Sequence, residues 1–200
     1  MKTILQINAS LFSEQGHSSQ LAQRFAQTWQ SRNPDNRLIV RDLAQNPVPH
    51  LTAERFQAFL TPVGERTATQ QAIAADSDAL IDELRQADVV VMGLPMYNFG
   101  IPSTLKAYFD HTSRAGVTFR YSETGALGLL DDKPVYILAT RGGIYQGTPK
   151  DTATPYVQDL FNFIGIHNIR FIYAEGLNLG QEQLDRSLAE AQAQIDRLAV

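Results

Sequence analysis

The sequence contains no cysteine, which excludes disulfides, thiolate nucleophiles and cysteine metal ligands. Any redox chemistry must therefore come from a bound cofactor. The four histidines, His17, His50, His111 and His167, show neither a His-x-x-x-His pair nor the carboxylate spacing of a metal site. We therefore expect no metal.

Positive charge is also scarce. The chain has 17 Lys and Arg residues against 21 Asp and Glu, and the basic residues are scattered, which argues against nucleic acid as a partner. No stretch reaches the roughly 18 consecutive apolar residues of a membrane span. Met1 and Lys2 lead directly into a short apolar segment rather than a signal sequence. We expect no membrane partner and a cytoplasmic location.

The composition that is present, 44% hydrophobic and 19% charged, is that of an ordinary globular protein. A chain of 200 residues can bury one core, and we expect a single domain over residues 1–200. Five apolar segments have the length and composition of buried strands: Thr3 to Asn8, Arg37 to Arg41, Asp88 to Pro95, Pro134 to Thr140, and Ile169 to Ala174.

Amphipathic segments separate these strands. They predict a first helix with Leu21, Phe25 and Trp29 on one face. Further helices are predicted from Thr52 to Leu60, beginning at Thr69, beginning at Ser103, over Asp159 to Gly165, and over Leu184 to Leu198. Strands that alternate with helices favour an α/β fold, a doubly wound parallel sheet with helices on both faces. Gly116 to Tyr121 alternates as a small strand or hairpin, and Gly125 and Gly128 then predict an irregular loop.

The stretch from Asp88 to Pro102 organises the rest of the chain. Its buried apolar run breaks at Pro95 into Met96, Tyr97, Asn98 and Phe99, which is typical of a binding loop. In open α/β sheets, ligands lie outside the carboxyl ends of the strands. The aromatic faces of Tyr97 and Phe99, together with the amide of Asn98, suit a planar heteroaromatic ligand.

The polar segment from Ala9 to Ser19 lies between the first strand and the first helix. Backbone N–H groups at a helix N-terminus, with the hydroxyls of Ser10, Ser18 and Ser19, can bind a phosphate. The alternative is that Ser18 or Ser19 is only an N-cap. Neither the Walker motif nor the G-x-G-x-x-G motif of dinucleotide sites is present.

A third loop, Thr140 to Gly143, follows the fourth strand. Its two adjacent glycines permit close backbone approach to a ligand, although they could also form a plain turn. The three loops belong to the same edge of the predicted sheet. A phosphate site, a ring site and a close backbone contact together describe a mononucleotide with a large flat base, and FMN fits.

Four segments resemble the FMN-dependent NADH:azoreductases of bacteria, within the larger NAD(P)H:quinone oxidoreductase group. They are Met96-Tyr97-Asn98-Phe99, Thr140-Arg141-Gly142-Gly143, Arg114 to Tyr121, and Phe163 to Ile166, and the resemblance covers essentially the whole chain. It implies a flavodoxin-like sheet of strand order 2-1-3-4-5. It also implies a homodimer with one non-covalent FMN per subunit, NADH as electron donor, and azo compounds and quinones as acceptors.

The resemblance also implies roles for individual residues. Ser10 and Gly16-His17-Ser18 would hold the phosphate, Met96 to Phe99 the ring and ribityl side, and Thr140 to Gly143 the pyrimidine edge. Members of the family often have Ser-Gln-Ser where this chain has Gly16-His17-Ser18, and often Ser where it has Thr140. Gly16 lacks the side-chain donor and keeps its N–H, and Thr140 keeps a hydroxyl.

The implied reaction is a two-electron hydride transfer at FMN N5 with ping-pong kinetics, because one open face of the ring serves both NADH and the acceptor in turn. No acid or base is assigned. Asn98, Tyr121 and Phe163 are candidates for the substrate side, although aromatic residues such as Tyr121 and Phe163 are as often plain core. The competing function is a flavodoxin-type electron carrier, which usually has a strongly acidic docking face, and a net charge of -4 is modest.

Overall fold

A computed structural model of the protein describes residues 1–32 and 34–198. Five parallel strands form one sheet in the order β2-β1-β3-β6-β7. These are β1 (Thr3–Asn8), β2 (Arg37–Asp42), β3 (Val89–Pro95), β6 (Val135–Thr140) and β7 (Ile169–Ala174). The predicted flavodoxin-like order of the five sheet strands is confirmed.

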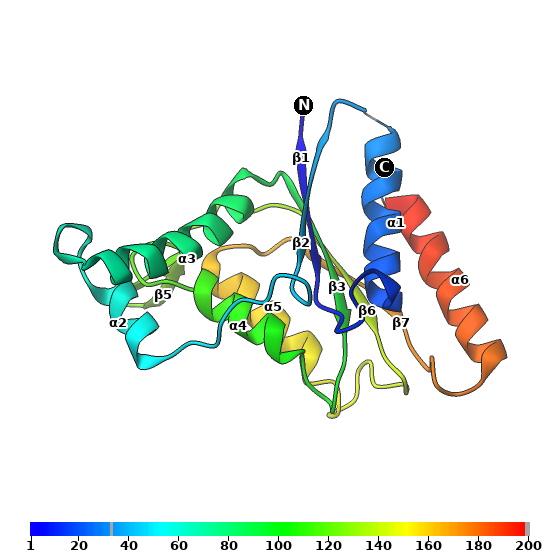
Figure 1. The fold of residues 1–200 in the computed structure, drawn as a ribbon. Coiled ribbons are helices and arrows are strands. Elements are labelled where there is room, and N and C mark those ends of the chain that lie inside the picture. Colours follow the sequence, from blue (N-terminus) through cyan, green and yellow to red (C-terminus); the bar gives the residue numbers. More distant parts are fainter. Residues whose placement is uncertain (33, 199–200) are drawn as a thin grey trace.

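Helices cover both faces of the sheet (Figure 1). One face is covered by α1 (His17–Ser31) and α6 (Gln181–Leu198), and the other by α3 (Ala68–Gln86), α4 (Ser103–Thr112) and α5 (Ala153–Ile164). The short helix α2 (Ala53–Leu60) packs against α3. Two 3₁₀ turns, Ser13–Gln15 and Val63–Glu65, complete the helical elements that the structure describes. Within those same ranges, no helix combines the length and apolarity needed to cross a membrane.

The central strand β3 shows why its sequence has no polar alternation. Val91 packs into the core under α1 and α6, whereas Val90 and Met92 pack into the core under α3, α4 and α5. Because both faces are covered by helices, every residue of β3 is buried. The strand therefore fixes the two layers of helices relative to the loop that follows Pro95.

A separate antiparallel hairpin joins β4 (Phe119–Ser122) to β5 (Gly125–Gly128). The prediction of an irregular loop at Gly125 and Gly128 is wrong, because these glycines are the first and last residues of β5. Gly125 has a φ of 125°, which favours glycine at the turn into β5. A Cβ at Gly128 would overlap the backbone of Gly165, so glycine lets the hairpin contact the end of α5.

Other boundaries also differ from the sequence patterns. Helix α5 begins at Ala153, six residues before the predicted Asp159, and Pro155 lies in its first turn, a position that tolerates proline. Helix α1 begins at His17, so Ser18 and Ser19 lie inside the helix rather than in the preceding loop. The predicted helix after Thr52 is confirmed, since the Thr52 side chain accepts a hydrogen bond from the N–H of Arg55 at 3.3 Å.

Candidate functional site

Two adjacent cavities lie at the carboxyl ends of the strands. The α1 cavity, about 340 Å³, is bounded by the loop after β1, the start of α1, and the ends of β3 and β6. The aromatic cavity, about 440 Å³, is bounded by the loops after β3, β6 and β7. Met96, Gly142 and Asn178 line both cavities, so the two form one continuous site.

All twelve residues predicted to bind a cofactor line this site. The α1 cavity is lined by Ser10, Gly16, His17, Ser18, Met96, Tyr97, Thr140, Arg141 and Gly142. The aromatic cavity is lined by Met96, Asn98, Phe99, Gly142 and Gly143. The chain therefore brings together three loops that lie far apart in the sequence.

Hydrogen bonds join the loop after β1 to the loop after β3. Ser10 Oγ accepts a hydrogen bond from the N–H of Phe12 at 3.2 Å and lies 3.4 Å from the hydroxyl oxygen of Tyr97. The Tyr97 hydroxyl oxygen also accepts a hydrogen bond from the N–H of Leu11 at 3.2 Å. The Tyr97 hydroxyl therefore positions the loop after β1, which forms one wall of the α1 cavity.

A glycine N-cap and one close backbone approach place the N-terminus of α1. Gly16 is the N-cap and makes no side-chain cap, so the alternative that Ser18 or Ser19 is the N-cap is wrong. A Cβ at Gly93 would lie 2.7 Å from the carbonyl oxygen of Ser18, so only glycine in β3 lets α1 pack this closely on the sheet. The first turn of α1 is thereby fixed against the central strand.

The Ser18 and Ser19 hydroxyls are buried in that first turn. Each residue is 1% exposed, and neither hydroxyl has a hydrogen-bond partner among the residues that the structure describes. Buried polar groups are normally paired, and an exception calls for a ligand or another physical cause. Only Ser18 lines the α1 cavity. Its hydroxyl and the helix N-terminus suit a phosphate dianion.

A tight turn presents the aromatic part of the loop after β3. The N–H of Tyr97 donates to the carbonyl of Gly100, and the N–H of Gly100 donates to the carbonyl of Tyr97, both at 3.0 Å. Asn98 and Phe99 between them have φ values of 49° and 67°, as in a type I′ turn. Phe99 in this conformation costs about 1–2 kcal/mol. The hydroxyl of Thr152 donates to the carbonyl of Phe99 and helps to hold the turn.

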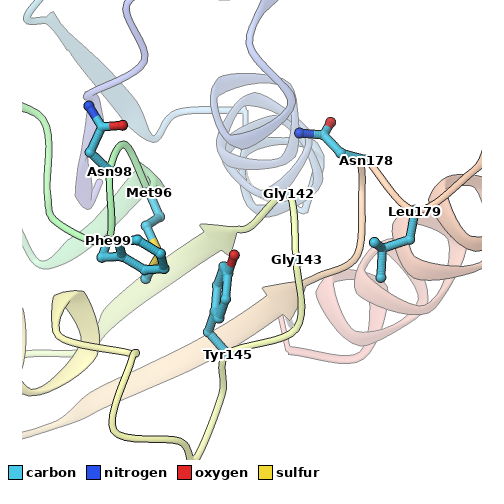
Figure 2. A pocket seen from close by; sticks show the side chains of 8 residues that line it. All are labelled: Met96, Asn98, Phe99, Gly142, Gly143, Tyr145, Asn178 and Leu179. Carbon is cyan, nitrogen blue, oxygen red and sulfur yellow. The ribbon is translucent and has the colours of Figure 1, made fainter.

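Figure 2 shows the side chains that the loop after β3 meets across the aromatic cavity. The Phe99 and Tyr145 rings lie edge to face with centroids 5.6 Å apart. A Cβ at Gly143 would lie 2.7 Å from the Tyr145 hydroxyl oxygen, and one at Gly142 would lie 2.5 Å from Asn178 Nδ2. The side chains of Tyr145 and Asn178 therefore pack closely against the two glycines, and all four residues line the aromatic cavity.

Two nitrogens of the Arg141 guanidinium are committed to the protein, whereas its buried Nε has no hydrogen-bond partner among the described residues. Nη1 donates to the carbonyls of Leu94 at 3.3 Å and Thr140 at 3.1 Å, and Nη2 lies 3.4 Å from Asp151 Oδ1. Burial lowers the pKa of Arg141, and the nearby Asp151 carboxylate opposes that shift. The Arg141 side chain therefore links the ends of β3 and β6 to Asp151, just before α5.

Tyr121 and Phe163 lie away from the site of their own chain. Phe163 is at the far end of α5, where its ring packs 4.2 Å from Phe119, whose ring lies 5.6 Å from Tyr121. The other end of α5 is next to Thr152, which contacts Phe99, and α5 rises by about 16 Å between these points. Tyr121 is 75% exposed. Asn98, the third substrate-side candidate, does line the aromatic cavity.

Several residues that line the site were not predicted. They are Phe12, Gln15, Pro95, Tyr145, Leu177, Asn178 and Leu179. Three of them follow β7, whose carboxyl end lies at the same edge as the other strands, so the sequence did contain a signal for that loop. Within the described residues, no cluster of three or more His, Asp or Glu side chains could hold a metal ion.

The chain is similar to known proteins over essentially its whole length. Residues 2–199 match a protein family whose description is "flavodoxin-like fold". The chain is 56% identical to an FMN-dependent NADH:quinone oxidoreductase of Cellvibrio japonicus, with 98% of each chain covered. It is 50% identical to a protein of that name from Alcanivorax borkumensis, over 96% of this chain and 97% of the relative.

Solved structures of azoreductases share the fold of this chain. The crystal structure of an azoreductase from Bacillus anthracis superposes with a TM-score of 0.90 at 27% identity, covering 100% of this chain and 99% of the other. An FMN-dependent NADH-azoreductase from Bacillus anthracis, in complex with FMN, has a TM-score of 0.87 at 26% identity and covers 100% of both chains.

Proposed function

Because this chain belongs to the flavodoxin-like family that includes the FMN-dependent NADH:quinone oxidoreductases, we propose that it is an FMN-dependent oxidoreductase of that kind. NADH is the electron donor, and quinones and aromatic azo compounds are the acceptors. The observation that carries the proposal is the buried Ser18 hydroxyl beside the N-terminus of α1, which has no partner in the part of the chain that the structure describes. It lies in a cavity that continues into one lined by aromatic rings.

The residues of the site fit FMN. The Ser18 hydroxyl and the first-turn N–H groups of α1 would hold the phosphate, with Ser10, Gly16 and His17 around it. The ring would lie in the aromatic cavity, between the turn of Asn98 and Phe99 and the loop that carries Gly142, Gly143 and Tyr145. When bound, FMN supplies the two-electron hydride chemistry.

The chain's own part in the reaction is placement. None of the eight residues that line the aromatic cavity is Asp, Glu, His, Lys or Arg. Acceptor choice therefore depends on the shape of the cavity and on polar groups such as the amides of Asn98 and Asn178, because hydride transfer requires near contact of the reacting atoms. A flat ring bound between these loops would leave one face for both NADH and the acceptor, which would then occupy it in turn, and ping-pong kinetics are therefore expected.

A homodimer would complete the site. Tyr121 is exposed on the β4–β5 hairpin, and neither it nor Phe163 lines the cavities of its own subunit. A second subunit could bring its hairpin over the open face of the ring, as pockets often form at interfaces. Sedimentation at micromolar concentration tests this part of the proposal, and an active monomer would contradict it. The cytoplasmic location expected from the sequence stays a prediction.

The alternative function is a flavodoxin-type electron carrier. Such a carrier needs a protein docking surface, usually strongly acidic, and the net charge of this chain is only -4. Steady consumption of NADH in the presence of FMN and a small quinone distinguishes the two. The enzyme oxidises NADH continuously until the quinone is exhausted, whereas a carrier does not turn over NADH with a small quinone.

A further inference from the structure

The loops after β6 and β7 are joined beyond the ends of their strands. The N–H groups of Gly176, Leu177 and Asn178 donate to the carbonyls of Gly143, Arg141 and Gly142 at 2.8, 3.1 and 3.0 Å, respectively. The backbone of residues 141–143 is therefore held by that of residues 176–178. Tyr145, which faces Phe99 in Figure 2, lies just beyond this paired segment.

Glu175 holds the next two residues of the loop. Its Oε1 accepts hydrogen bonds from the N–H groups of Tyr145 at 2.8 Å and Gln146 at 2.9 Å. The backbone of Glu175 is itself anchored to α6. Its N–H donates to Ser187 Oγ at 2.8 Å, and its carbonyl accepts from Gln183 Nε2 at 3.3 Å. Helix α6 thus fixes Glu175, and Glu175 fixes the backbone from which the Tyr145 ring projects.

We propose that Glu175 is a positioning residue of the cofactor site, whose carboxylate fixes the backbone that places the Tyr145 ring in the aromatic cavity, where the flavin ring would bind. Glu175 does not line the aromatic cavity, whereas Tyr145, whose N–H it binds, does, so we assign its effect on the site to Tyr145. The inference rests on the proposed function, because the ring that the cavity fits is that of FMN.

The chain contains a matched control for this arrangement. Asp132 Oδ1 also accepts two consecutive backbone N–H groups, those of His167 at 2.8 Å and Asn168 at 3.1 Å. It too links the segments next to β6 and β7, but it does so before the strands begin, at the opposite edge of the sheet. Removing Asp132 therefore deletes the same kind of bonds without touching the cofactor site.

The test compares Glu175→Ala, Glu175→Gln and Asp132→Ala in the full chain. The readouts are the FMN dissociation constant, the visible absorption and circular dichroism of bound FMN, and the melting temperature without FMN. Glu175→Ala should weaken FMN binding by about tenfold, the effect of losing hydrogen bonds to a charged group, and should change the flavin spectrum. Glu175→Gln should behave like the wild type, because the amide oxygen can accept both bonds.

Asp132→Ala should lower the melting temperature and leave FMN affinity and the spectrum unchanged. A Tyr145→Ala variant adds a double-mutant cycle: Glu175→Ala should have no further effect on FMN affinity in that background if it acts through Tyr145. Unchanged affinity and spectrum in Glu175→Ala would overturn the inference, as would equal weakening by Asp132→Ala. A wild-type protein that binds no FMN would instead contradict the proposed function itself.

Discussion

The side chain of Ser10 fills the space into which any side chain at Gly16 would project. A Cβ at position 16 would overlap Ser10 Oγ and lie 2.6 Å from Ser10 Cβ. Gly16 has an ordinary extended φ of -72°, so glycine is needed here for space and not for backbone freedom. At that point of the α1 cavity the hydroxyl is therefore supplied by Ser10.

The first prediction is that Gly16→Ser lowers the free energy of unfolding by about 1–3 kcal/mol, the usual cost of overpacking, and weakens FMN binding. The control is Gly64→Ser, where no atom lies within 4 Å of an added Cβ. The double change Ser10→Gly with Gly16→Ser should restore both properties, because it supplies the hydroxyl from the other position. Chemical denaturation and FMN titration measure the two effects. A single variant as stable as the wild type would contradict this geometry.

The second prediction separates two neighbouring serines. Ser18→Ala should leave the stability of the FMN-free protein unchanged or raise it, because it removes a buried hydroxyl without a partner among the described residues. It should weaken FMN binding by about 1.5–3 kcal/mol, the range for a hydrogen bond to a charged group. Ser19→Ala removes a hydroxyl that is equally buried but lies outside the α1 cavity, so it should not affect FMN binding. Equal losses of FMN affinity in both variants would disprove the assignment.

The third prediction concerns the hairpin. Tyr121→Ala should reduce kcat/KM for a small quinone several-fold, since an aromatic pair contributes about 0.5–1.5 kcal/mol beyond its buried area. The fold should be unaffected, because Tyr121 is mostly exposed. Leu127→Ala is the control, a change to another exposed apolar residue of the same hairpin. Initial rates at saturating NADH measure the effect. An unchanged kcat/KM in a dimeric Tyr121→Ala protein would show that the hairpin does not reach the acceptor.

The fourth prediction is a pH dependence of stability that arises from His111. The residue is fully buried, and burial lowers its pKa, although the hydrogen bond between Nδ1 and the carbonyl of Ala107 opposes the shift. Because the unfolded chain binds this proton more readily, stability should be highest above about pH 6.5 and fall as the pH drops below it. His111→Gln should flatten that dependence below about pH 6.5. A variant with the slope of the wild type would exclude His111 as its source.

The sequence predicted the five sheet strands because buried apolar runs separated by amphipathic helices are strong local signals, whereas the order of the strands came from the family resemblance. It failed at Gly125 and Gly128, because glycine in a strand reads as a loop unless the contact between Gly128 and Gly165 is known. That contact joins segments far apart in the chain. The start of α5 was missed for a local reason, because Pro155 reads as a helix breaker although it lies in the first turn.

The site was predictable loop by loop, but its internal contacts were not. The twelve residues of the three predicted loops do line the cavities. Nothing local, however, indicates that Asn178 and Tyr145 occupy the space beside Gly142 and Gly143, because these contacts depend on how the loops after β6 and β7 pair. The assignment of individual residues to FMN stays a prediction that binding experiments must test.

The most direct measurement is an anaerobic titration of the FMN-loaded protein, followed by absorbance at about 450 nm, where oxidised flavin absorbs. One equivalent of NADH should remove this absorbance, and one equivalent of a small quinone should restore it, since both are two-electron reagents. Repeating the cycle should consume one NADH for each quinone. Absorbance that NADH does not remove, or that a one-electron acceptor restores while the quinone does not, would contradict the assignment of this protein as an NADH:quinone oxidoreductase.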